Sequence, residues 1–322
     1  MELDQRAEMH TIKPWRAFFP IIDSSAVETS FEKIPFANRG VGLDAMAAGP
    51  KDGPVAVLLH GFPEFWYGWR KQIEPLAKAG FRVIVPDQRG YNVSSKPRGV
   101  ASYALTELVS DVIAMADELG QKQILLAGHD WGAAVAWGAA LLHPKRIAKL
   151  AVVNVPHPSV MRRFLTTQPR QILRSWYIFF FQIPWLAETI FSASGFYVGT
   201  RALVRSSRPG TFSADDLAQY RAAWSQPGAL ASMINWYRAA LRYRARFADP
   251  TVRVPTRILW GERDKFLIPE MARESLRYCT HGELFPFPDA THWLLHEEPA
   301  KVSELLVEFF QSGSPLSETT PD

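Results

Sequence analysis

The sequence predicts an α/β protein with a doubly wound, mostly parallel sheet and an inserted, all-helical lid. Three observations lead to this expectation. Short apolar runs rich in branched residues alternate with amphipathic helical patterns, this alternation returns after residue 250, and residues 157–250 show helical spacing without a clear buried strand. Runs that are apolar throughout are typical of strands buried on both faces of a parallel sheet. Their alternation with helices favours helices on both sides of that sheet.

The expected elements of the core follow in chain order. Four runs have the pattern of a buried strand: VAVLLHG (55–61), RVIVPD (82–87), QILLAGHD (123–130) and KLAVVNVP (149–156). TELVSDVIAMADELG (106–120) places apolar residues three and four apart and ends at a glycine, as an amphipathic helix does. TRILWGERD (256–264) resumes the strand pattern, and PAKVSELLVEFFQS (299–312) predicts a closing helix.

We therefore expect a core domain made of residues 31–156 and 251–312, with the lid at 157–250. A lid inserted after the carboxyl end of a strand would lie above the edge at which open α/β sheets bind ligands. Residues 1–30 are expected to form an N-terminal arm and residues 313–322 a disordered tail.

Composition and charge exclude several classes of protein. Of the 322 residues, 47% are hydrophobic and 21% are charged, which indicates a globular protein with a sizeable core. The net charge of +4 comes from scattered side chains, so we expect no nucleic-acid partner. The most apolar run, WYIFFFQIPWLAETIF, is broken by Gln182, Pro184 and Glu188. It is shorter than the roughly 20 residues of a membrane span, so stable membrane insertion is not expected.

The N-terminus is too polar for a secretory signal, and the lone Cys279 cannot form an internal disulfide. Both observations favour a cytoplasmic location. The sequence leaves the choice between a monomer and a homodimer open.

The segment ILLAGHDWGAAVAWGAALLHP (124–144) predicts a buried strand, a tight turn and a helix rich in Ala and Gly. Its GHDWG has the form of a strained strand-to-helix turn, whose glycines leave room beside a central nucleophile. That central residue is Asp130, at a helix N-terminus where the helix dipole favours an anion. A carboxyl with an ordinary pKa of about 3.9 is already ionised at neutral pH. We therefore predict that Asp130 is a nucleophile rather than a helix cap.

Three motifs together resemble the soluble and bacterial epoxide hydrolases of the α/β-hydrolase fold. They are HGFPEFWYGWRKQIEPLAKAGFRVIVPDQRGYNVSSKP (60–97), GHDWGAAVAW (128–137) and NVPHP (154–158). The resemblance runs from about residue 30 to residue 312. The motifs are specific as a set, although each alone is shared with haloalkane dehalogenases. The resemblance implies an α/β-hydrolase fold whose nucleophile, acid and histidine follow one another in the chain.

The resemblance also assigns the partners of Asp130. Asp264, in LWGERDKFLIPE, takes the position of the acid, with Glu262 as the nearby alternative, and His292, in DATHWLLHEEP, takes that of the histidine. The backbone N–H groups of Phe62 and Trp131 would form the oxyanion hole.

Pro63 resembles the family's cis-proline, because it follows His-Gly-Phe in the first motif. We expect structural or supporting roles for the other histidines of the motifs and the histidine loop: His60, His129, His157 and His296.

A carboxylate nucleophile suits displacement at a saturated carbon, which forms an alkyl ester of Asp130. His292, oriented by Asp264, would then deprotonate the water that attacks the ester carbonyl. The oxyanion hole would stabilise the tetrahedral intermediate. This chemistry leaves two types of leaving group: a halide, which needs N–H donors, and an epoxide oxygen, which needs a proton donor.

The lid contains five tyrosines that could donate this proton: Tyr177, Tyr197, Tyr220, Tyr237 and Tyr243. Phenols are suitable weak acids, with a pKa near 10. Tyr177 in WYIFFFQIPW and Tyr237 in INWYRAALR resemble the two lid tyrosines of the epoxide hydrolases. Helical spacing alone favours a packing role for both, whereas the resemblance assigns them as the acids.

Aromatic residues near these motifs predict an apolar substrate site formed by Phe62, Trp131, Trp176, Phe179, Phe180 and Trp236. We predict an epoxide hydrolase that converts a small apolar epoxide and water to a vicinal diol, without a cofactor or a metal. The identity of the epoxide stays open, as does the choice between detoxification, catabolism and biosynthesis.

Three alternatives remain. Haloalkane dehalogenases commonly carry Asn where this chain has Phe62, and fluoroacetate dehalogenases carry Arg and an acid at the positions of Trp131 and Asn154. A non-catalytic ligand receptor or scaffold of the same fold typically lacks a member of the triad, whereas this chain retains Asp130, Asp264 and His292. A plain esterase is the third alternative.

Overall fold

The computed structural model describes residues 30–313. The expected N-terminal arm, up to residue 29, and the expected tail, from residue 314, lie outside the described residues.

The described chain contains one sheet of eight strands in the order β1-β2-β4-β3-β5-β6-β7-β8. The strands are β1 Glu32–Asn38, β2 Val41–Ala48, β3 Val55–Leu59, β4 Arg82–Pro86, β5 Ile124–His129, β6 Ile147–Val153, β7 Thr256–Gly261 and β8 Gly282–Phe287. β2 pairs antiparallel with both β1 and β4, and the remaining pairs are parallel. The predicted mostly parallel sheet is therefore confirmed.

The central strands are apolar throughout because helices cover both faces of the sheet. Every residue of β3, β5 and β7 is buried. In β3, Val57 and Leu59 pack into one hydrophobic cluster, whereas Ala56 and Leu58 pack into the cluster on the opposite face. This alternation follows from the two-residue period of a strand.

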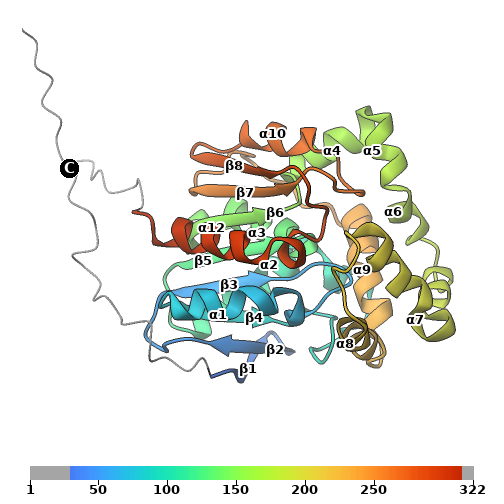
Figure 1. The fold of residues 1–322 in the computed structure, drawn as a ribbon, viewed down its shortest axis with the longest axis horizontal. Helices are drawn as coiled ribbons and strands as arrows, with labels where there is room; N and C mark the ends of the chain where they lie inside the picture. The colour runs from blue at the N-terminus through green and yellow to red at the C-terminus, as the bar shows by residue number, and fades with distance from the viewer. Residues whose placement is uncertain (1–29, 314–322) are drawn as a thin grey trace, which may run out of the picture.

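Helices α1 (Arg70–Lys78) and α12 (Pro299–Gln311) lie side by side across one face of the sheet (Figure 1). The other face is covered by α2 (Leu105–Glu118) and α3 (Trp131–Leu142), which pack against each other. The short α10 (Glu270–Leu276) packs on β8, and α11 (Leu294–Glu297) precedes α12. Buried aliphatic side chains between helices and sheet supply the core, each contributing roughly 1.5–3 kcal/mol when fully buried.

Residues 157–250 form a helical insertion between β6 and β7, at one end of the sheet (Figure 1). Its helices are α4 Pro158–Thr167, α5 Pro169–Arg174, α6 Trp176–Phe180, α7 Leu186–Ser206, α8 Ala214–Trp224 and α9 Ala229–Arg242. α7 is interrupted at residues 193–196, where Ser194, Gly195 and Phe196 have left-handed φ values of 51°, 67° and 65°. Phe196 and Phe191 meet the ring of Trp224 across this break.

Among residues 30–313, no helix is both long enough and apolar enough to cross a bilayer. The same residues contain no cluster of three or more His, Cys, Asp or Glu side chains that could hold a metal ion.

Candidate active site

Asp130 lies at the tip of a sharp turn between β5 and α3, with φ 49° and ψ −121°. Positive φ is uncommon for a residue with a side chain, so the surrounding packing must hold this conformation. The flanking glycines are required because a Cβ on Gly132 would lie 2.1 Å from the Leu59 carbonyl oxygen, and one on Gly128 would lie 2.4 Å from the Gly132 oxygen. A Cβ on Gly61 would lie 2.3 Å from the Asp130 Cβ. The turn therefore holds the Asp130 carboxyl against the loop after β3.

Three side chains that are distant in the sequence meet at this turn. His292 Nε2 lies 3.4 Å from Asp130 Oδ2, and His292 Nδ1 lies 2.6 Å from Asp264 Oδ2. Asp264 and His292 are buried, whereas the Asp130 side chain retains 17% exposure. Asp264 thus orients the imidazole, and Asp130 is the carboxyl that a small molecule can reach.

Besides His292, three hydrogen-bond donors hold the Asp264 carboxyl. Oδ1 accepts hydrogen bonds from the backbone N–H groups of Phe266 at 2.7 Å and Leu267 at 3.0 Å. Oδ2 accepts a hydrogen bond from the side-chain Nδ2 of Asn154 at 2.8 Å. The side-chain Oδ1 of Asn154 in turn accepts the Gly261 N–H at 3.0 Å. A carboxylate in place of Asn154 would lack this donor. These bonds fix the orientation of Asp264 beneath His292.

The loop after β3 supplies an N–H group to the nucleophile. The Phe62 N–H donates to Asp130 Oδ1 at 2.6 Å. Trp131 is the first residue of α3, so its N–H is among those without an intrahelical acceptor. The Phe62–Pro63 peptide bond is cis, which confirms the expectation for Pro63. Phe62 and Trp131 thus provide the backbone groups that an oxyanion hole at Asp130 would use.

The charges in the site favour an ion pair. Burial alone would raise the pKa of Asp130, but the hydrogen bond and charge of His292, together with the Phe62 N–H, hold it below its ordinary value. Burial alone would lower the pKa of His292, but the charge of Asp264 and the bond to Asp130 raise it to about 10. The site therefore contains an ionised carboxylate beside an imidazolium at neutral pH.

Tyr177 on α6 and Tyr237 on α9 come together beside the nucleophile. Their ring centroids are 5.9 Å apart, and the Tyr237 ring lies 4.9 Å from the ring of Trp131 and 5.1 Å from that of Phe62. Burial first, and then the negative charge of Asp130, raise the pKa of both phenols above its ordinary value. Both hydroxyls are therefore protonated and available as donors.

The other aromatic residues of the predicted substrate site differ from one another in burial. Trp236 is fully buried, packs against Trp131 and donates its indole N–H to the Arg89 carbonyl at 3.0 Å. Phe180 is half-buried beside Phe181.

Trp176 packs against Phe180 with ring centroids 5.9 Å apart, but Trp176 and Phe179 both face solvent. Their side chains are 63% and 54% exposed. This position does not support the substrate contact expected for either residue.

A buried carboxylate that the sequence reasoning did not single out lies behind the site. Glu64 Oε1 accepts the Tyr220 hydroxyl at 2.7 Å and pairs with His296 Nε2 at 2.8 Å, and its Oε2 pairs with His129 Nδ1 at 3.0 Å. His129 Nε2 in turn lies 2.8 Å from the His292 carbonyl oxygen. A signal was present in the sequence, because Glu64 directly follows the HGFP motif.

The two remaining histidines of the motifs hold the backbone. His60 Nε2 accepts the Gln88 N–H at 3.1 Å, and His157 Nδ1 accepts the Ser159 N–H at the start of α4. These contacts agree with the expected structural roles.

A family model for the alpha/beta hydrolase fold matches residues 54–299. The chain therefore belongs to the alpha/beta hydrolase fold family. Within that family, the similarities group it with the epoxide hydrolases, as the motifs predicted.

Three relatives illustrate this grouping. The AB hydrolase superfamily protein YfhM of Bacillus subtilis is 44% identical over 87% of this chain and 98% of its own length. Human epoxide hydrolase 4 is 38% identical over 85% of this chain and 77% of its own length. The crystal structure of Bacillus megaterium epoxide hydrolase in complex with an inhibitor matches with a TM-score of 0.79 and 30% identity, covering 87% of this chain and all of that one.

Proposed function

We propose that the protein converts a small apolar epoxide and water to a vicinal diol through a covalent ester of Asp130. One observation carries the proposal: an ionised carboxylate at a strained turn lies 3.4 Å from an imidazole that Asp264 orients, beside the buried phenol of Tyr237 and the half-buried phenol of Tyr177. The relatives named as epoxide hydrolases support it.

In the first half-reaction, an oxygen of Asp130 attacks a carbon of the oxirane and the carbon–oxygen bond of the ring breaks. The epoxide oxygen takes a proton from Tyr177 or Tyr237, so that no free alkoxide is expelled. The product is a neutral hydroxyalkyl ester of Asp130, together with one tyrosinate.

In the second half-reaction, His292 takes a proton from water while the hydroxide adds to the ester carbonyl. The N–H groups of Phe62 and Trp131 stabilise the resulting oxyanion, each donor contributing about 3 kcal/mol. The intermediate releases the diol, whose leaving oxygen takes the proton from His292. The carboxylic acid of Asp130 then ionises and its proton returns to His292, which restores the resting ion pair, so the cycle consumes one epoxide and one water.

Ester formation changes the acidity of His292. In the free enzyme its pKa is about 10, partly because it is bonded to and attracted by ionised Asp130. The ester has no negative charge, so this contribution disappears and the pKa of His292 falls. His292 then passes its proton through solvent to the tyrosinate, which regenerates the phenol and leaves the neutral imidazole that the second half-reaction requires.

The rate of ester hydrolysis is expected to rise with pH and to level off at a pH below about 10, because only neutral His292 accepts a proton. Ester formation is expected to be nearly independent of pH over roughly pH 6 to 8, because Asp130 is ionised and the phenols are protonated there. Single-turnover quench experiments resolve the two rates. Ester hydrolysis that slows as the pH rises would contradict this role of His292.

The substrate is proposed to lie among Phe62, Trp131 and Tyr237, whose rings pack against one another next to the Asp130 turn. The helical insertion supplies both tyrosines and is proposed to act as the lid. These rings favour an apolar substrate, because they offer few hydrogen bonds beyond the phenol and the Trp131 indole N–H.

The double variant Tyr177→Phe, Tyr237→Phe is expected to lower diol formation from styrene oxide by about 10²- to 10⁴-fold, because no general acid remains. Wild-type protein is assayed in parallel with styrene oxide and with a bromoalkane, and the rates of diol formation and bromide release are compared. The wild type is expected to form diol in preference to bromide.

The matched control for the double variant is Tyr197→Phe, Tyr243→Phe, which changes two exposed tyrosines of the same insertion. Diol formation that survives the loss of Tyr177 and Tyr237 would reject them as the acids. Preferential bromide release by the wild type would instead favour the dehalogenase alternative.

A further inference from the structure

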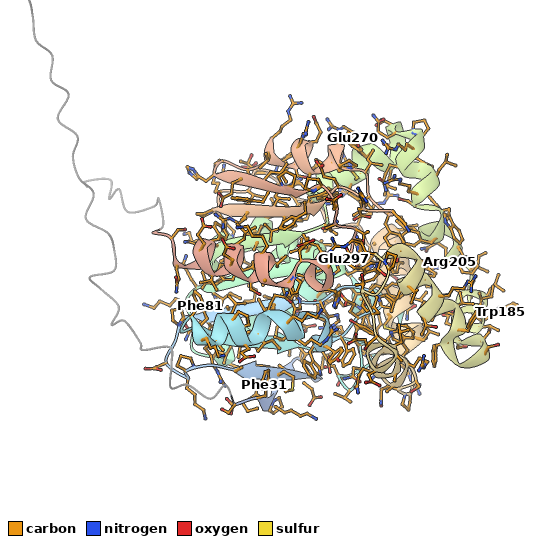
Figure 2. The ribbon with its side chains drawn as sticks, in the orientation of Figure 1. Phe31, Phe81, Trp185, Arg205, Glu270 and Glu297 are labelled. Atoms are coloured by element: carbon orange, nitrogen blue, oxygen red, sulfur yellow. The ribbon has the colours of Figure 1, made fainter. Side chains whose placement is uncertain are left out.

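The outer surface of the helical insertion is unusually apolar. Of the thirteen large apolar side chains that are exposed among residues 30–313, ten lie between residues 172 and 204. The most exposed are Leu173 at 75%, Trp185 at 72%, Trp176 at 63%, Phe179 at 54% and Tyr197 at 53%. Figure 2 shows Trp185 at the outer end of the insertion, pointing away from the core. We call this surface of α5, α6 and α7 the outer lid face; concentrations of this kind mark interaction sites.

The insertion also differs in charge from the rest of the chain. Residues 157–250 contain twelve arginines, no lysine and four acidic residues, a net charge of +8. The whole chain has a net charge of +4, so the remainder has a net charge of −4. The described core, residues 30–156 and 251–313, has a net charge of zero, so the apolar surface belongs to the strongly cationic part of the described chain.

Arginines lie within the outer lid face itself. Arg201 and Arg205 on α7 are exposed, and neither has an ion-pair partner among the described residues. The Arg201 guanidinium lies 5.6 Å from the centre of the Tyr197 ring. Glu188, the only acidic residue between 157 and 213, is already paired with Arg238 at 2.6 Å. Arg201 donates to the Tyr197 hydroxyl at 2.6 Å, so the face presents two guanidinium groups that have no carboxylate partner among the described residues.

We propose that the outer lid face docks onto an anionic lipid bilayer, with its aromatic side chains at the headgroup level and its arginines on lipid phosphates. Exposed Trp, Phe and Leu beside basic residues are the pattern of a surface that lies in the membrane interface. A second copy of the chain fits this face less well. A symmetric dimer would place the same cationic surface of both copies together, and like charges oppose that contact.

Docking would also bring the site close to the bilayer. On α6, Tyr177 packs inward against Tyr237 and Phe181, whereas Phe179 is directed outward. If the protein hydrolyses apolar epoxides, as proposed above, docking would place it where such substrates concentrate. Membrane binding itself does not depend on that function and is measured without any epoxide.

The test is co-sedimentation of the full chain with vesicles of phosphatidylcholine, with or without an equal share of phosphatidylglycerol. The protein is expected to bind the anionic vesicles at least about tenfold more tightly, and high salt should weaken the binding. Arg201→Gln with Arg205→Gln is expected to weaken binding roughly 30-fold, as two surface cations would. Phe179→Ser with Trp185→Ser is expected to weaken it at least about tenfold.

Two control variants change similar residues elsewhere. Lys33→Gln with Lys122→Gln removes the same charge from exposed positions of the core, and Phe31→Ser with Val93→Ser removes exposed apolar side chains there. Both are expected to bind vesicles as the wild type does, and circular dichroism checks the fold of all four variants. Equal binding to neutral vesicles, no binding, or equal effects of core and lid variants would overturn the proposal. So would a dimer, seen by light scattering, that the Phe179 and Trp185 variant abolishes.

Discussion

Replacing Asp130 with alanine is expected to abolish epoxide turnover, with a loss of at least about 10⁴-fold, because no other residue can form the ester. The carboxylate accepts a hydrogen bond from the Phe62 N–H and lies 3.4 Å from His292 Nε2. Without it, no ester can form for the activated water to hydrolyse. Diol formation from styrene oxide measures the loss. The fold should survive, because the strained turn depends on the glycines around Asp130.

The control for this variant is Asp52→Ala, which removes an exposed carboxyl between β2 and β3. It should retain full turnover. A single turnover in heavy-oxygen water adds an independent readout, because the scheme puts the label into the Asp130 carboxylate of the wild type. An Asp130→Ala variant that retains normal turnover, or a label found only in the diol, would reject the covalent mechanism.

His292→Gln is expected to stop the reaction after its first half. Asp130 remains ionised beside the phenols, so the ester should still form, whereas its hydrolysis should slow by about 10²- to 10⁴-fold without a general base. The protein should therefore accumulate an adduct whose added mass equals that of the epoxide. Mass spectrometry of the intact chain, followed by peptide mapping, should locate the adduct at Asp130.

His143→Gln is the matched control, since His143 is exposed at the end of α3. This variant should show no lasting adduct and normal turnover. Rapid turnover by His292→Gln would remove His292 from the mechanism. Failure of that variant to form an adduct with a substrate that the wild type consumes would count against the two-step scheme.

The sheet was predictable because its central strands are buried on both faces and so appear as unbroken apolar runs. Expected and observed bounds differ by at most three residues, as for residues 149–156 against β6 Ile147–Val153. The hairpin of β1 and β2 was not singled out. β1 is an edge strand with alternating exposure, and its sequence EKIPFAN contains charge and proline.

The nucleophile was predictable because its turn needs glycines at fixed positions, and the motif GHDWG (128–132) shows them. The contacts of Asn154 and Glu64 were not, because each depends on partners more than 60 positions away. Trp176 and Tyr177 show a further limit. Neighbouring residues on a helix point about 100° apart, and a five-residue helix is too short for its apolar pattern to show which side faces inward.

Glu64 binds His129 before the nucleophile, His296 after the catalytic histidine and Tyr220 in the insertion. Glu297 makes a second junction, because it accepts the N–H of Arg208 in the insertion at 2.8 Å and the N–H of Thr291, next to His292, at 2.7 Å. If the insertion separated from the core, these buried carboxylates would lose hydrogen-bond partners. Heating or denaturant should therefore unfold the insertion and the core in one cooperative transition.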